Sequence, residues 1–320
     1  MKKIGIFPAS GGLGGSTYRH LLKVVANDNV ILINRHPDKI PQEYVDAGVI
    51  ARPASYESTP AELEQAFSGI DILFLISYPS HVHEYRVKVQ LPAIDAARRA
   101  GVKHIFYSSL GFASDPKTLT KASSLAVVMQ AHLDTERYLE TIAGSNSSFT
   151  YTSVREGLYS ESFPIYTAFF NPKDPPEHGE IQIPHDGSGP GVAWVKRDEL
   201  GEATAALIAR FSGVGPQFPK AYVNGKVLLT GKRVWTLAET VTELSKVAGK
   251  PLRIRQITTD EYAALPQVLN RFGSKEKALT WATAWEAIRN EETAVVSPEL
   301  EEILGRPPEA FDVTLKEQWS

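Results

Sequence analysis

Short apolar runs alternate with amphipathic segments through the first half of the chain. Several of the runs are apolar on both faces, as strands inside a parallel sheet are. We expect strands at Lys3–Phe7, Val30–Asn34, Ile70–Ile76, His104–Ser108 and Phe149–Val154. Strands that alternate with helices predict an α/β fold, in which helices cover a parallel sheet.

Three segments between these runs have helical signals. Residues 18–25 place apolar side chains at the i, i+3, i+4, i+7 spacing of one buried face. Thr59-Pro60-Ala61-Glu62 is typical of a capping box with proline at the first helical position. Residues 84–100 are helical in pattern, with Pro92 as an expected kink.

The pattern changes after Arg155. Residues 156–192 are rich in proline, glycine and aromatic residues, which indicates loops and short strands. Helical periodicity returns at Asp198, a strand is expected at Val227–Thr230, a second capping box stands at residues 236–239, and the tail is helical in composition. We therefore predict a Rossmann-type, doubly wound domain over residues 1–155, completed by parts of 193–232. Residues 156–320 are expected to form a smaller, mainly helical substrate domain.

Composition narrows the class of protein. The 320 residues have a formal net charge of -3, which gives no electrostatic reason to expect nucleic acid or an anionic membrane as partner. The sequence has no cysteine, so disulfides and thiol catalysis are excluded. No run resembles a signal peptide or a membrane span, and a cytoplasmic location is the expectation.

The strongest motif is the glycine-rich stretch from Pro8 to Ser16, PASGGLGGS, between the first strand and the first helix. Glycines let the backbone approach a pyrophosphate, and the helix N-terminus presents N–H groups and a partial positive charge to it. In this strand–turn–helix context the motif predicts a dinucleotide site.

The end of the second strand indicates which dinucleotide binds. NAD sites usually have Asp or Glu there for the ribose 2′-hydroxyl, whereas arginine suits a 2′-phosphate. This sequence has Asn34-Arg35-His36 at that point and Lys39 shortly after it. We therefore predict NADP(H) as the cofactor.

The chain resembles the NmrA-like family of atypical short-chain dehydrogenase proteins. Its glycine turn is similar to the family's Gly-x-x-Gly-x-x-Gly, with Pro8 in place of the first glycine. Proline cannot take a positive φ, so the turn geometry is expected to differ. Further segments resemble the family's in order along nearly the whole chain: Tyr107–Gly111, His132–Glu136, Ser153–Glu161 and Leu304–Pro308.

Ordinary short-chain dehydrogenases transfer a proton with a Tyr-x-x-x-Lys pair on one helix face. The family register places Val128 and His132 in those two positions. The only such string in the chain, from Tyr222 to Lys226, contains Asn-Gly and is expected to be a turn. The usual proton-transfer pair is therefore absent.

Two functions remain open at this point. The first is an NADPH-dependent reductase of a small apolar or aromatic carbonyl, quinone, imine or enone, which relies on positioning the substrate and takes its proton from His132, Tyr159 or water. His132 at the lysine position resembles the quinone-reductase branch of the family. The second is a non-catalytic regulator that senses NADP(H) and acts through a protein partner, as the NmrA-type regulators are believed to do.

The candidate site combines the glycine turn with residues at the carboxyl ends of strands, where ligands of open α/β sheets bind. His132 and Tyr159 are the catalytic candidates. The aromatic stretch from Tyr159 to Phe170 is expected either to be core or to form the wall of an apolar pocket over the nicotinamide. His81 and His83 have no third ligand nearby, and no metal is predicted. The predicted cofactor contacts are Pro8, Ala9, Ser10, Gly11, Gly12, Leu13, Gly14, Arg35, Ser77, Tyr78, Pro79, Ser108, His132 and Tyr159.

Overall fold

The computed structural model describes residues 2–319 and places the strands predicted for the first half in one seven-stranded sheet. In sheet order these strands are β10 (Gly225–Leu229), β8 (Thr150–Glu156), β5 (His104–Leu110), β4 (Ile72–Ile76), β1 (Ile4–Phe7), β2 (Val30–Asn34) and β3 (Ile50–Pro53). β1 pairs in parallel with both β2 and β4. The chain adds strands first on one side of β1 and then on the other, which confirms the doubly wound, Rossmann-type fold.

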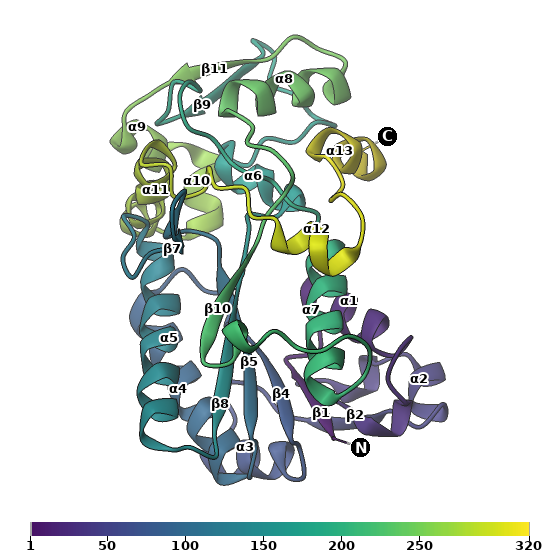
Figure 1. The fold of residues 1–320 in the computed structure, drawn as a ribbon. Helices are drawn as coiled ribbons and strands as arrows, with labels where there is room; N and C mark the ends of the chain where they lie inside the picture. Colours follow the sequence, from purple (N-terminus) through teal and green to yellow (C-terminus); the bar gives the residue numbers. More distant parts are fainter. Residues whose placement is uncertain (1, 320) are drawn as a thin grey trace. The chain divides into compact units, whose positions relative to one another are not determined.

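Helices lie on both faces of the sheet (Figure 1). One face forms a continuous core with α3 (Pro60–Phe67), α4 (His83–Arg99) and α5 (Val127–Ser145). On the other face, His104 at the start of β5 stacks on Phe211 of α7 (Arg197–Ser212), with ring centroids 3.8 Å apart. The strands are therefore buried on both sides, as their apolar runs predicted.

Local sequence signals determine where several helices begin. The predicted capping boxes are both formed: Thr59 caps α3, and Thr236 caps α8 (Leu237–Ala248). α4 follows the helix predicted at residues 84–100 and contains Pro92. A short helix, α2 (Gln42–Asp46), and 3₁₀ turns at Asn27–Asn29, Pro37–Lys39, Ser160–Ser162 and Lys220–Tyr222 complete the connections.

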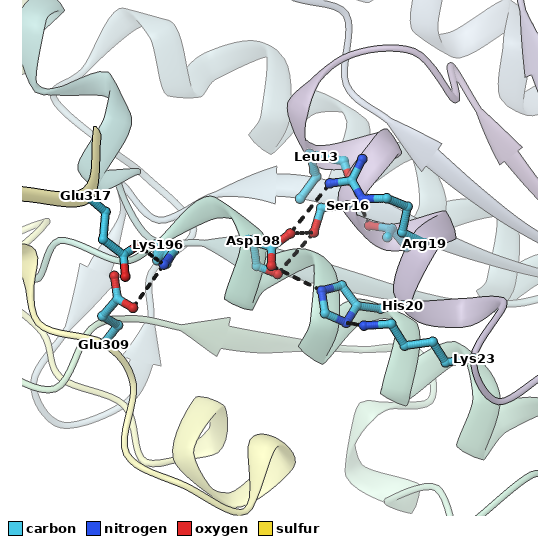
Figure 2. A network of polar contacts seen from close by, with 10 residues as sticks. Leu13, Ser16, Arg19, His20, Lys23, Lys196, Asp198, Glu309 and Glu317 are labelled. Carbon is cyan, nitrogen blue, oxygen red and sulfur yellow. Dashed lines mark hydrogen bonds and ion pairs between the residues drawn. The ribbon is translucent and has the colours of Figure 1, made fainter. Parts of the chain in front are cut away.

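The first helix, α1 (Gly12–Leu21), packs closely on α7. A Cβ atom added to Gly201 of α7 would lie 2.2 Å from the Ser16 hydroxyl oxygen, so glycine is required for this approach. Ser16 Oγ donates to the Asp198 carboxylate at 2.6 Å, and His20 Nε2 lies 3.2 Å from the same carboxylate (Figure 2). These contacts hold the first turn of α7 against the second half of α1.

The chain divides into two units of nearly equal length. The first comprises the chain up to Ser109 together with 131–155 and 197–227, so α7 completes it within the range expected from the sequence. The second comprises 110–130, 156–196 and the chain from Leu228 onward. Residues 110–130 thus differ from the predicted division. The reason is Glu292, whose buried carboxylate accepts hydrogen bonds from the backbone N–H groups of Ala113 (3.2 Å) and Leu125 (2.9 Å).

The second unit is mainly helical around an aromatic core. Trp194 stacks on Phe311 with centroids 5.4 Å apart, and Tyr262 meets Trp285 edge-on at 4.6 Å. Lys196 binds both Glu309 and Glu317 (Figure 2). Its elements are β6 (Ser114–Asp115), β7 (Leu119–Thr120), α6 (Phe163–Tyr166), β9 (Glu180–Ile183), α8, β11 (Arg253–Gln256), α9 (Thr259–Ala264), α10 (Pro266–Phe272), α11 (Lys275–Arg289), α12 (Glu299–Leu304) and α13 (Phe311–Trp319). None of the helices within residues 2–319 is long and apolar enough to cross a membrane.

Candidate functional site

The glycine turn joins β1 to α1, as predicted. Its positive φ lies at Gly11 (97°), the residue before the helix, and not at Pro8, so proline in the first position is compatible with the turn. A Cβ atom on Gly14 would lie 2.7 Å from the Pro8 carbonyl oxygen, so helix and turn approach too closely for a side chain there. The first turn of α1 contains no acidic residue, and its N–H groups and partial positive charge suit a phosphate.

Arg197 adds a cation beside this turn. A Cβ atom built on Gly12 would lie 2.3 Å from Arg197 Cζ, so the guanidinium covers the first residue of α1. The neighbouring Asp198 fixes this position through its contacts with Ser16 and His20 (Figure 2). Sequence reasoning missed Arg197 because the chain returns to the turn only after some 180 residues, with no local signal.

A pocket of about 400 Å³ lies beside the turn, at the carboxyl ends of β1, β2 and β4. Of the predicted cofactor residues, it is lined by Pro8, Ser10, Arg35, Tyr78 and Pro79, and Lys39 lies there as well. The lining residues that were not predicted are Asn34, His36, Ala54, Ser55, Tyr56 and Glu57. We refer to this pocket, which lies entirely within the first unit, as the Arg35 pocket.

The charged groups of the Arg35 pocket form a chain of contacts. Arg35 Nη2 lies 2.7 Å from the Glu57 carboxylate, and Tyr78 Oη donates to the same carboxylate at 2.9 Å. That bond to Glu57, with partial burial, raises the pKa of Tyr78 to about 12, so the hydroxyl remains a donor at neutral pH. The arginine predicted from the end of β2 is thus exposed and has a carboxylate partner.

The remaining predicted cofactor residues of the first unit lie around the turn or within the sheet. Ala9 and Leu13 are buried, whereas Gly11 and Gly12 are exposed. Ser77 is half-buried next to Tyr78. Ser108 is buried in β5, beside Ile76 at the end of β4.

His132 is buried in α5, and both of its ring nitrogens have hydrogen-bond partners. Arg86 Nη2 lies 2.6 Å from His132 Nε2, and Tyr107 Oη lies 3.1 Å from His132 Nδ1. Because arginine only donates, Nε2 must be the acceptor and Nδ1 carries the proton. Burial, followed by the charges of Arg86 and Arg155, holds the pKa of His132 well below its usual value. The ring is therefore neutral, and these surroundings favour a positioning role over that of an acid.

The contacts of His132 continue to the Arg35 pocket. Gln90 Nε2 donates to Tyr107 Oη at 3.3 Å and to Thr135 Oγ1 at 2.9 Å, while Gln90 Oε1 accepts the backbone N–H of Tyr78 at 2.7 Å. His132, Tyr107 and Gln90 are all at most 4% exposed. We refer to Arg86, His132, Tyr107, Gln90 and Thr135 as the buried network. It holds the backbone of a residue that lines the pocket.

Tyr159, the other catalytic candidate, belongs to the second unit. Its hydroxyl donates to the Glu156 carboxylate, and its backbone pairs with Val195. Glu156 is 1% exposed and Tyr159 is half-buried. The phenol proton thus already has a strong acceptor.

The aromatic stretch after Tyr159 is divided between core and pocket wall. Phe163 and Tyr166 are buried in the aromatic core, Tyr166 with its centroid 5.4 Å from that of Trp194. Phe169 and Phe170 line a pocket of about 390 Å³ within the second unit. The expectation of core is thus confirmed for Phe163 and Tyr166, and the expectation of a pocket wall over the nicotinamide stays a prediction.

Val128 and His132, which the family register places at the positions of the usual proton-transfer pair, both lie on α5. The Tyr222–Lys226 string spans a turn in which Asn224 has a φ of 56°, so its two side chains do not share a helix face. In the part of the chain that the structure describes, no group of three or more His, Asp or Glu side chains is arranged for a metal ion. His83 instead lies 2.6 Å from Asp134.

Comparison with known proteins was made with this geometry in hand. The model of the NmrA-like family matches residues 1–293. The chain is 30% identical over 305 residues to an NmrA-like family domain-containing oxidoreductase of Aspergillus flavus, covering 94% of this chain and 89% of that one.

Two solved structures are similar over almost their whole length. One is the NADPH-dependent quinone oxidoreductase of Escherichia coli complexed with NADPH, with a TM-score of 0.77, 26% identity and coverage of 99% of this chain and 100% of that one. The other is the Citrobacter sp. triphenylmethane reductase complexed with NADP(H), with a TM-score of 0.74, 26% identity and coverage of 98% and 99%. Both relatives contain the dinucleotide that the end of β2 predicts for this chain.

Proposed function

Because the chain belongs to the NmrA-like family, we propose that it is an NADP(H)-dependent oxidoreductase that reduces a small apolar or aromatic acceptor. The observation that carries the proposal is the Arg35 pocket beside the glycine turn, where β2 ends on Asn34 and is followed by Arg35 and not by an acid. The cofactor is NADP(H).

The cofactor's phosphates are assigned to two cationic places. The pyrophosphate binds the N–H groups at the start of α1, with Arg197 beside them. The adenosine 2′-phosphate binds Arg35, with Lys39 in the same pocket. Tyr78 and Pro79 line the same pocket. Of the remaining predicted contacts of the first unit, Ser77 and Ser108 are assigned to the nicotinamide end.

The acceptor is inferred from what the chain provides for proton transfer. NADPH supplies a hydride, and the reduced acceptor then needs a proton. His132 is neutral and sealed in the buried network, and Tyr159 donates to Glu156. Reduction of a quinone or an enone leaves the charge on a conjugated oxygen, which is a weaker base than a simple alkoxide and depends less on a positioned acid. Quinones and enones therefore suit a site that works by positioning, whereas neutral imines and simple ketones need a positioned acid.

A steady-state screen of NADPH oxidation against quinones, enones, imines and simple ketones tests this proposal. We expect turnover with quinones or enones, a strong preference for NADPH over NADH, and little activity with unactivated ketones. Turnover of simple ketones at comparable kcat would contradict the positioning account.

The alternative is a non-catalytic sensor of NADP(H) that acts through a protein partner. The observation in its favour is that Val128 and His132 replace the usual proton-transfer pair on α5. A sensor must bind NADPH and NADP⁺ with different consequences for its partner, because a ligand shifts only an equilibrium whose states it binds unequally. Failure of the whole acceptor panel, together with tight NADPH binding, would favour this alternative.

A further inference from the structure

The Arg35 pocket contains a carboxylate where the proposed ligand has a phosphate. Glu57 follows β3 and lines the pocket together with Arg35 and Tyr78. Its carboxylate receives Arg35 at 2.7 Å and the Tyr78 hydroxyl at 2.9 Å. A negative group next to the arginine of a 2′-phosphate site opposes the binding of that phosphate.

Glu57 is held in this position as an anion. Its backbone N–H donates to Ser55 Oγ at 3.2 Å, which fixes the turn that carries it. Partial burial acts to raise the pKa of Glu57, but hydrogen bonds from Tyr78, Ser55 and Arg35 outweigh it and lower the pKa below its usual value. The side chain is therefore charged throughout the neutral range.

We infer that Glu57 is a specificity-determining residue, which competes with the adenosine 2′-phosphate for Arg35 and thereby limits the preference for NADPH over NADH. This inference rests on the proposed placement of the 2′-phosphate at Arg35. Glu57 orients the side chain of Arg35 through their ion pair. When NADPH binds, the phosphate must share or replace this partner and approaches a like charge at close range.

The same carboxylate acts in the opposite sense on NADH. A ribose 2′-hydroxyl is a donor, and a carboxylate is its usual partner in NAD sites. Glu57 therefore weakens the binding of the phosphorylated cofactor and stabilises the unphosphorylated one. The arginine at the end of β2 and the glutamate after β3 determine the ratio of the two affinities together.

The test is Glu57→Gln, which removes the charge and retains the size and hydrogen-bonding capacity of the side chain. Dissociation constants for NADPH and NADH are measured by calorimetric titration. We expect NADPH to bind about threefold to tenfold more tightly and NADH to bind about twofold more weakly. These changes are modest because the substitution alters one partly exposed charge, whose interactions are screened by solvent. Asp38→Asn is the matched control, because it removes the same charge from an exposed residue outside the pocket lining. It should change the affinity ratio by less than about twofold.

Arg35→Ala distinguishes an error in the role of Glu57 from an error in the proposed placement of the 2′-phosphate. If it weakens NADPH selectively while Glu57→Gln leaves the affinity ratio unchanged or lowers it, Glu57 only orients the arginine and this inference is wrong. If Arg35→Ala weakens NADPH and NADH equally, the placement of the 2′-phosphate itself is wrong. In the Arg35→Ala background, Glu57→Gln should lose the part of its effect that depends on the arginine, and full retention of its effect would contradict competition for Arg35.

Discussion

The Arg35 pocket and the buried network both contact Tyr78, but they differ in how far their charged and polar side chains are exposed to solvent. In the pocket, Arg35 and Glu57 are 59% and 36% exposed, and their ion pair can exchange partners at little cost. In the network, Arg86 and His132 are 3% and 4% exposed, and losing a partner there costs the desolvation of a buried polar group. Tyr78 joins them, since its hydroxyl contacts Glu57 and its N–H contacts Gln90. An exposed ion pair is thus suited to ligand exchange, and a buried hydrogen-bonded network is suited to holding the pocket in shape.

The largest expected effect is on the glycine turn, which adjoins the Arg35 pocket. Gly14→Ala places a methyl group 2.7 Å from the Pro8 carbonyl oxygen, so the turn must shift and several phosphate contacts weaken together. At about 1.5–3 kcal/mol for each charge-assisted hydrogen bond, NADPH affinity should fall by more than about 100-fold.

Gly144→Ala is the matched control for this variant. Gly144 lies on α5, where an added Cβ meets nothing within 4 Å, and NADPH binding should remain unchanged. Unaltered NADPH affinity in Gly14→Ala would show that the phosphates bind elsewhere.

The buried network should matter for stability. His132→Ala removes the partner of both Arg86 and Tyr107, and we expect it to lower the free energy of unfolding by about 2–4 kcal/mol. Urea denaturation measures this change. His36→Ala makes the same substitution at an exposed residue of the pocket and should cost less than about 0.5 kcal/mol. Equal losses of unfolding free energy in the two variants would contradict the claim that the buried network contributes more to stability than the exposed pocket residues do.

Buried and exposed histidines should also differ in how far they make the free energy of unfolding depend on pH. The test case is His104 of β5, which lies outside both the pocket and the network. His104 is fully buried, and burial lowers its pKa to about 3, so the unfolded chain takes up a proton that the folded protein excludes. Stability from this residue is fully present above pH 6.5 and is lost as the pH falls toward 3. Between pH 7 and pH 5 the loss is about 2 kcal/mol, from the 1.36 kcal/mol per pKa unit of one proton.

His104→Gln should therefore make the unfolding free energy less sensitive to pH over this interval by about 2 kcal/mol. The exposed His36 is the control, and His36→Gln should leave the pH dependence as it is in the wild type. Identical pH profiles for the wild type and His104→Gln would mean that His104 is protonated in the folded protein.

The smallest expected effect concerns catalysis. If the enzyme works by positioning, Tyr159→Phe should reduce kcat at pH 7 by less than about tenfold, because an essential general acid is worth about 10²–10⁴-fold. The measurement is steady-state NADPH oxidation with the acceptor identified by the screen. A thousandfold fall in kcat with unchanged NADPH affinity would identify Tyr159 as the acid.

The sequence predicted those parts of the site that have local signals. The turn, Arg35 at the end of β2 and the loop from Ser77 to Pro79 after β4 each follow a strand with a clear apolar run. β3 was missed because Ile50–Pro53 is short, partly exposed and ends on proline, and Glu57, which follows it, was missed as a consequence. Arg197 meets the turn only through the packing of α7 on α1, which no local pattern reveals.

The surroundings of His132 likewise depend on contacts between segments far apart in the sequence, which no local pattern reveals. The family register singled out His132, and the structure places it on α5. Its neutral state follows from burial and then from the charge of Arg86, which lies 46 residues away on another helix. Resemblance identified the position, and only the packing of α4 against α5 shows what surrounds it.

The most direct test of the central claim is a calorimetric titration of the wild type and Arg35→Ala with NADPH and NADH. We expect Arg35→Ala to weaken NADPH binding by about 1.5–3 kcal/mol, the loss typical of a charge-assisted contact, and to leave NADH binding nearly unchanged. Equal losses for the two dinucleotides would contradict the assignment of the Arg35 pocket to the 2′-phosphate.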